Sequence, residues 1–136
     1  MRLALGSAQF GMPYGINNSN GQVSSQNVQA ILEFAASVGI DTIDTAIAYG
    51  NSEHALGNAG VGSFKVVTKL PEIPTNIDDI ADWIHRAIEG SISRLGIKSL
   101  HGLMLHRPGQ LLESRGAEIM SALRALNGYG LVENLG

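Results

Sequence analysis

The hydrophobic residues of this chain follow two alternating spacings, which predict short buried strands separated by amphipathic helices. Strands are predicted where a short apolar run contains β-branched or aromatic residues, and helices where apolar residues recur every three or four positions. The predicted strands cover residues 3–8, 41–44, 64–69, 100–105 and 131–135. The predicted helices cover residues 25–38, 52–56, 77–95 and 111–126.

Polar and glycine residues set the expected ends of the helices. Thr75 or Asn76 is the predicted N-cap of the longest helix, because both side chains can accept a hydrogen bond from a free backbone N–H. Gly96 follows the last apolar position of that helix, where a glycine commonly ends it. In the first helix, Val38 is predicted to lie on the buried face.

The order of these elements is an alternation of strands and helices joined by short turns. Such an order indicates parallel strands connected by helical crossovers, which are almost always right-handed. No linker or shift in composition divides the 136 residues, so a single domain is expected. Two architectures agree with the pattern: an open, doubly wound sheet and a part of a (β/α)8 barrel. Periodicity does not choose between them.

Composition and charge exclude several classes of function. The net charge of −3 provides no basic surface for nucleic acid, and the absence of cysteine excludes disulfides, thiol nucleophiles and cysteine-ligated zinc. No segment has the length and apolar character of a signal peptide or a membrane span. We therefore expect a cytoplasmic protein that binds neither nucleic acid nor a membrane.

Four residues with reactive side chains lie at or just after the ends of predicted strands. They are Asp44, Tyr49, Lys69 and His106. The carboxyl ends of parallel strands meet on one edge, where both barrels and open sheets build their sites. Taken singly, each also fits a structural role: a turn aspartate, a packing tyrosine, a solvated lysine and a loop histidine. Their shared edge favours the functional interpretation.

Strand geometry separates these residues from similar ones nearby. Lys65 faces the same side as Lys69, but it lies four residues earlier, roughly 13 Å down the strand at ~3.3 Å per residue. Asp41 and Asp44 are three residues apart and point to opposite faces. We therefore expect Lys65 and Asp41 to lie outside the site, and likewise His101, which is five residues before His106 and so points to the opposite face.

The chemistry of the four residues suggests proton donation to a carbonyl group. A tyrosine hydroxyl is a weak acid, a nearby ammonium favours its phenolate form, and a carboxylate keeps the ammonium charged. Tyr49 would donate the proton, Lys69 and Asp44 would assist it, and His106 would orient the carbonyl oxygen. Reduction also needs a hydride, which no side chain supplies, so a nicotinamide cofactor is implied.

Three motifs in this chain resemble those of a known enzyme family. Residues 39–53 contain the core Asp-Thr-Ala-x-x-Tyr-Gly-x-Ser-Glu, Val67-Thr68-Lys69 follows as a strand, and residues 91–96 precede a strand that ends in His106-Arg107-Pro108. This set resembles the aldo/keto reductase superfamily, and the opening residues are similar to bacterial members linked to polysaccharide biosynthesis.

The resemblance implies a (β/α)8 TIM barrel, NADP(H) as cofactor and a small-molecule aldehyde or ketone as substrate. It assigns the catalytic roles to the same four residues, with hydride from the nicotinamide and the proton from Tyr49. It also implies that Gly6, Ser7 and Asp44 contact the cofactor.

The length of the chain limits the expected barrel, because a complete (β/α)8 barrel needs about 250 residues and this chain has 136. Residues 1–136 correspond to the N-terminal half of such a barrel, about four βα units and the start of strand five. The family's nicotinamide-binding Ser or Asn and its adenosine-phosphate loop lie beyond this half. We therefore expect either a truncated chain with impaired cofactor binding, or a half barrel that associates with a second copy as a homodimer. The alternative is a non-catalytic binding, regulatory or oligomerising module on the same fold.

Overall fold

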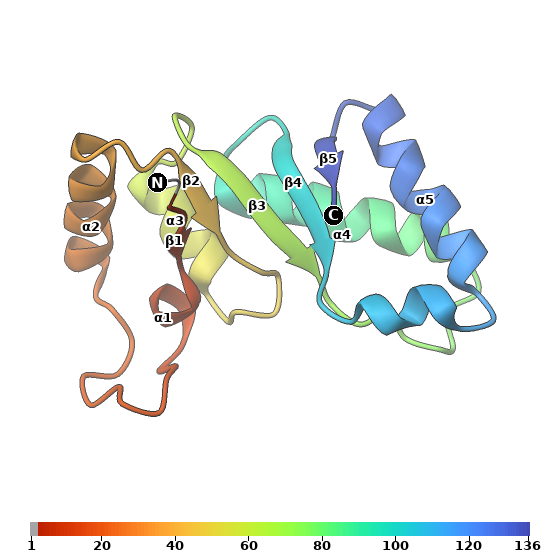
Figure 1. Ribbon diagram of the computed structural model, residues 1–136, viewed down its shortest axis with the longest axis horizontal. Coiled ribbons are helices and arrows are strands. Elements are labelled where there is room, and N and C mark those ends of the chain that lie inside the picture. The colour runs from red at the N-terminus through yellow and green to blue at the C-terminus, as the bar shows by residue number, and fades with distance from the viewer. Residues whose placement is uncertain (1–2) are drawn as a thin grey trace.

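The five strands form one parallel sheet in which the spatial order equals the chain order, as Figure 1 shows. The computed structural model describes residues 3–136. Its strands are β1 (Leu5–Gly6), β2 (Thr42–Asp44), β3 (Lys65–Leu70), β4 (Leu100–Leu105) and β5 (Val132–Leu135). Each strand pairs with the next one in parallel register, for example Gly6 with Asp44 and Asp44 with Val67.

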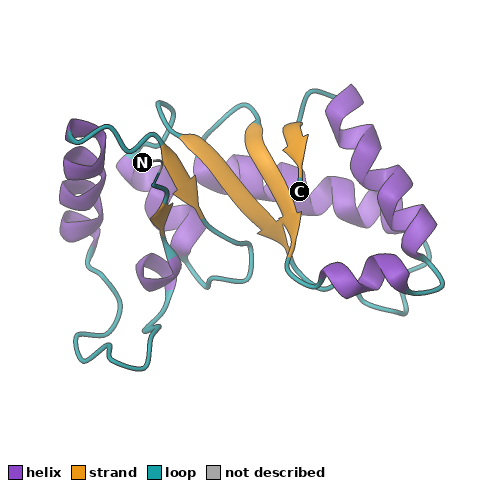
Figure 2. Ribbon diagram, in the orientation of Figure 1, coloured by secondary structure: helices purple, strands orange, loops and turns teal. Residues whose placement is uncertain are grey.

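Helices connect the strands and lie behind and beside the sheet in the view of Figure 2. They are α1 (Ala8–Gly11), α2 (Ser25–Ser37), α3 (Ser52–Ala59), α4 (Ile80–Leu95) and α5 (Gly116–Gly128), with a 3₁₀ helix, η1 (Pro108–Leu112). Neighbouring helices contact one another in sequence: α2 with α3, α3 with α4, and α4 with α5.

The sequential strand order decides between the two architectures. In a doubly wound sheet the strand order reverses near the middle, so that crossovers cover both faces. Here the order never reverses. Because parallel crossovers are almost always right-handed, such an order places the helices on a single face, as in a (β/α)8 barrel. The fold is therefore a five-stranded portion of a TIM barrel, in agreement with the sequence prediction.

The hydrophobic core lies between the sheet and these helices. Ile84 and Ile88 of α4 are fully buried, and they belong to one core cluster with strand residues such as Ile43 and Leu70, which are also fully buried. Burying one such side chain stabilises the fold by about 1.5–3 kcal/mol. The apolar spacing of three to four residues that predicts the longest helix is thus confirmed at the helix centre, where Ile84 and Ile88 are buried.

The predicted start of α4 at Thr75 or Asn76 is wrong. The helix begins after Asp79, whose carboxylate accepts a hydrogen bond from the backbone N–H of Asp82 at 2.9 Å. Upstream, the guanidinium of Arg115 donates to the carbonyl oxygens of two residues just before this cap. Because those carbonyls are bound from outside, the backbone before Asp79 does not join the helix.

Other features also differ from the prediction. The segment predicted as one helix over residues 111–126 is divided into η1 and α5, because the side chain of Gln110 bonds the backbone of Ile73 and holds η1 against it. The first strand is shorter than predicted, since the chain turns into α1 and buries Phe10. Val38 caps α2 and is 55% exposed instead of buried.

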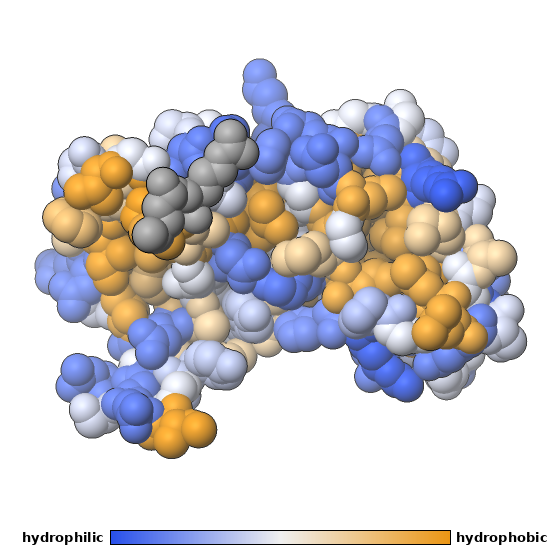
Figure 3. All heavy atoms as spheres, viewed as in Figure 1, coloured by the Kyte–Doolittle hydropathy of each residue, from blue (hydrophilic) through white to orange (hydrophobic). Residues whose placement is uncertain are grey.

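The edge strands and the exposed surface concern the predicted association with a second copy and the predicted absence of a membrane span. Strands β1 and β5 are the edge strands of the described sheet, and pairing of these edges with a second copy stays a prediction. Figure 3 shows hydrophobic side chains gathered over α2 on one side and around β5 and α5 on the other. No helix within residues 3–136 has the length and apolar character needed to cross a membrane.

Candidate functional site

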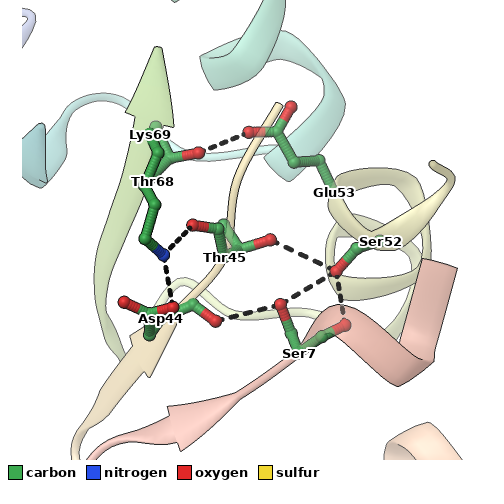
Figure 4. Close-up of polar contacts among 7 residues, drawn as sticks. All are labelled: Ser7, Asp44, Thr45, Ser52, Glu53, Thr68 and Lys69. Carbon is green, nitrogen blue, oxygen red and sulfur yellow. Dashed lines mark hydrogen bonds and ion pairs between the residues drawn. The ribbon is translucent and has the colours of Figure 1, made fainter. Parts of the chain in front are cut away.

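An ion pair joins the carboxyl ends of β2 and β3. The ammonium of Lys69 lies 2.5 Å from a carboxylate oxygen of Asp44, and it also donates a hydrogen bond to the carbonyl oxygen of Thr45 at 3.0 Å (Figure 4). The Lys69 side chain is 17% exposed, whereas that of Asp44 is 37% exposed. Asp44 and Thr45 thus bind the largely buried Lys69 ammonium, and the more exposed Asp44 carboxylate lies at the edge of the sheet.

Tyr49 and His106 complete the set that the sequence predicts. The Lys69 ammonium lies 5.2 Å from the centre of the Tyr49 ring, within cation–π range. The rings of Tyr49 and His106 meet edge to face, with centroids 5.8 Å apart and an interplanar angle of 88°. All four predicted residues therefore come together, while their catalytic roles stay predictions.

A close backbone contact holds the loop that carries Tyr49. A Cβ atom placed on Gly11 would overlap the Tyr49 carbonyl oxygen, so only glycine allows α1 to approach this loop. Gly50 has a φ of +53°, and its neighbour Asn51 donates its backbone N–H to the Gly11 carbonyl. The position of Tyr49 thus depends on a contact with a segment almost forty residues away in sequence.

The similar residues that strand geometry excluded lie apart from this site. Asp41 and Lys65 form their own ion pair at 2.7 Å, before the start of β2 and at the start of β3. The hydrogen bonds from Lys65 and Thr42 lower the pKa of Asp41 below its ordinary value. His101 pairs with Glu133 at 2.8 Å instead of joining His106. This part of the prediction is confirmed.

Of the residues predicted to contact a cofactor, Ser7 is placed differently from Gly6 and Asp44. Gly6 and Asp44 are register partners on the sheet edge, and a Cβ atom on Gly6 would meet nothing within 4 Å. Ser7 is fully buried, and its hydroxyl donates to the Asp44 carbonyl oxygen at 3.1 Å. The Ser7 side chain therefore has a structural partner in place of an open approach to a ligand.

Sequence reasoning did not single out the polar residues beneath this site. Thr45, Ser52, Glu53 and Thr68 are all buried and hydrogen-bonded to one another or to the strand ends. A signal was present in β3, where a threonine occupies a position that alternates with Val66 and Leu70 on the buried face. A polar residue at such a position needs a buried partner.

Comparison with known protein families identifies the class of protein. The aldo/keto reductase family model matches residues 2–136, almost the entire chain. The chain therefore belongs to the aldo/keto reductase family. A search among curated proteins finds no match.

Solved structures agree with this assignment. A crystal structure from Pseudomonas aeruginosa, described as a candidate aldo-keto reductase, is 28% identical with a TM-score of 0.79, and the match covers 98% of this chain and 53% of that one. The holo form of an aldo-keto reductase from Bacillus halodurans is 16% identical with a TM-score of 0.73, covering 99% and 45%, which supports the fold. This chain spans about half the length of these structures.

Proposed function

We propose that this chain supplies the acid–base residues for the NADP(H)-dependent reduction of an aldehyde or ketone. The observation that carries the proposal is the convergence of four groups: the 2.5 Å pair between Lys69 and Asp44, with the Tyr49 ring 5.2 Å from the ammonium and 5.8 Å from the His106 ring. A tyrosine, a cation and an imidazole at one open edge suit a carbonyl oxygen that gains negative charge.

Each residue has a distinct task in this proposal. Tyr49 donates its phenolic proton to the carbonyl oxygen as the C=O bond becomes a C–O single bond. Lys69 stabilises the phenolate that remains, and Asp44 keeps Lys69 in place. His106 donates a hydrogen bond to the same oxygen and orients the substrate. The product is an alcohol, and Tyr49 regains its proton from solvent.

The open edge beside Asp44 is compatible with a bound nicotinamide. The exposed Gly6 leaves free space next to the partly exposed Asp44 carboxylate, and we propose that these two residues border the cofactor. When bound, NADPH would supply the hydride that adds to the carbonyl carbon, and the cofactor would then be released as NADP⁺. Because this chain spans about half the length of the matched structures, other cofactor contacts are expected from residues outside it.

The test is aldehyde reduction by the longest product that the gene encodes, followed through the loss of NADPH absorbance. Tyr49→Phe should lower kcat roughly 100-fold or more, the usual contribution of a positioned general acid. Tyr129→Phe is the matched control, because Tyr129 is an exposed tyrosine that follows α5. If Tyr49→Phe keeps the kcat of the wild type, Tyr49 is not the general acid. If the wild-type protein binds NADPH but reduces no aldehyde, the proposed reductase activity is wrong.

A separate titration addresses residues 1–136 alone. NADPH fluorescence should change little when this chain is added, because the remaining cofactor contacts are expected elsewhere. Tight binding would contradict the impaired cofactor site that we predict from the sequence.

A further inference from the structure

Two consecutive residues at the start of α3 bind the strands that carry Asp44 and Lys69. Ser52 is fully buried and Glu53 is 2% exposed. Neither side chain reaches the open edge, and both point toward the strand ends beneath it (Figure 4). They follow Tyr49 by three and four residues, and the Ser52 backbone N–H donates to the Tyr49 carbonyl oxygen at 3.0 Å.

Ser52 belongs to a cluster of three buried hydroxyl groups. Its Oγ lies 3.2 Å from Thr45 Oγ1 and 2.9 Å from both the carbonyl oxygen and the Oγ of Ser7. Ser7 Oγ in turn donates to the carbonyl oxygen of Asp44. One arrangement of protons satisfies all three groups: Thr45 donates to Ser52, Ser52 donates to Ser7, and Ser7 donates to Asp44.

Glu53 binds the neighbouring strand in the same manner. One carboxylate oxygen accepts from Thr68 Oγ1 at 2.9 Å and from Ser91 Oγ at 2.6 Å. The other accepts from Arg94 Nε at 2.8 Å and lies 2.7 Å from its Nη2. The buried charge is therefore fully paired, and it connects β3 to both α3 and α4.

The partners of Ser52 and Glu53 are the direct chain neighbours of the ion pair. Thr45 follows Asp44, and Thr68 precedes Lys69. Successive side chains of a strand point to opposite faces. When Thr68 is held on the helix side, Lys69 must point to the other face, toward Asp44. When the Thr45 side chain is held by Ser52, its carbonyl oxygen stays 3.0 Å from the Lys69 ammonium.

We infer that Ser52 and Glu53 are positioning residues, which hold the two acceptors of Lys69 and the direction of its strand through Thr45 and Thr68. The catalytic meaning of this inference rests on the proposed function, whereas its structural content concerns only the geometry of Lys69. Neither residue contacts the reacting atoms, so each acts through the backbone of β2 or β3.

Competitive labelling of lysines with trace acetic anhydride measures that geometry directly. The chain has three lysines, and Lys65 and Lys98 serve as internal references for Lys69. Thr45→Val and Thr68→Val remove the two hydroxyls while preserving side-chain volume. In each variant Lys69 should be acetylated about fivefold faster than in the wild type, relative to Lys98. This factor corresponds to the loss of one hydrogen bond worth ~1 kcal/mol.

Conservative variants and a remote control separate positioning from a general loss of stability. Thr45→Ser and Thr68→Ser keep the hydroxyl and should retain the slow labelling of Lys69. Ser24→Ala deletes the serine hydroxyl that caps α2 and should leave the labelling ratio unchanged. If Thr45→Val does not fold by circular dichroism, Ser52→Ala provides the same test from the other side of the hydrogen bond.

Two results would overturn the inference. One is unchanged Lys69 labelling in folded valine variants. The other is an equal rise in the serine variants or in Ser24→Ala. Failure of the proposed function looks different: the labelling ratio changes as expected, but the protein reduces no aldehyde. A reductase that depends on Tyr49 but labels Lys69 identically in every variant would retain the function and exclude the positioning role.

Discussion

Glu53→Gln is expected to destabilise the fold strongly, because Glu53 is a buried carboxylate with four hydrogen-bond donors around it. Thr68, Ser91 and two nitrogens of Arg94 surround its oxygens at 2.6–2.9 Å. The substitution removes the charge and turns one acceptor oxygen into an NH₂ group. Toward Thr68 and Ser91 that NH₂ group could donate to the hydroxyls, but Arg94 would still lose its charged partner.

The magnitude follows from the burial of the two partners. Removing one partner of a buried ion pair costs about 3–5 kcal/mol. The Glu53 side chain is 2% exposed, but that of Arg94 is 31% exposed and regains water when it loses its partner. We therefore expect the lower end, about 3 kcal/mol. With a urea m-value of about 2 kcal/mol/M, the unfolding midpoint should fall by about 1.5 M.

Urea unfolding followed by tryptophan fluorescence measures this shift. Trp83 is the only tryptophan, and it lies in α4 and is partly buried against the core, so its emission reports the packing of that helix. Glu118→Gln is the matched control, because Glu118 also pairs with an arginine, Arg115, but on the surface. Its midpoint should not change measurably. A midpoint that falls by less than about 0.5 M in Glu53→Gln would refute the reasoning from burial.

Further predictions concern a helix crossing and acid sensitivity. Gly57→Ala should destabilise the fold by about 2 kcal/mol or more, because the added Cβ would overlap the carbonyl oxygen of Arg94 where α3 crosses α4. Thermal unfolding measures this loss of stability. A variant with the melting temperature of the wild type would contradict the prediction. Because Lys65 lowers the pKa of Asp41 in the folded state, this pair should stabilise the fold above pH about 3.8 and lose its effect as pH falls below that value. Urea midpoints of Lys65→Met and wild type should therefore converge in acid, and a difference that stays constant with pH would exclude this linkage.

The local pattern of the chain was sufficient to predict much of the site. Parity along a strand distinguishes Lys69 from Lys65, because a strand advances by a constant rise and alternates its faces. The spacing of strand ends likewise brings Asp44 to the same edge as His106. Both inferences need only regular strand geometry and parallel pairing, and the structure has both.

The helix boundaries show where local pattern was insufficient. Thr75 and Asn76 are suitable caps by residue type, but Asp79 performs the role. The difference arises from Arg115, which is 36 residues after Asp79 and binds carbonyl groups just before the cap. A cap preference of about 1 kcal/mol is easily overridden by such a tertiary contact.

What the chain's residues determined alone is the alternation of parallel strands and helices and the edge on which the reactive side chains gather. What required the folded molecule is the support beneath that edge. Ser52 meets Ser7 across 45 positions, and Glu53 meets Arg94 across 41. Hydrogen bonds between residues so far apart depend on how α3 packs against α1 and α4. No periodicity records that packing, because it arises only when the helices cover the sheet.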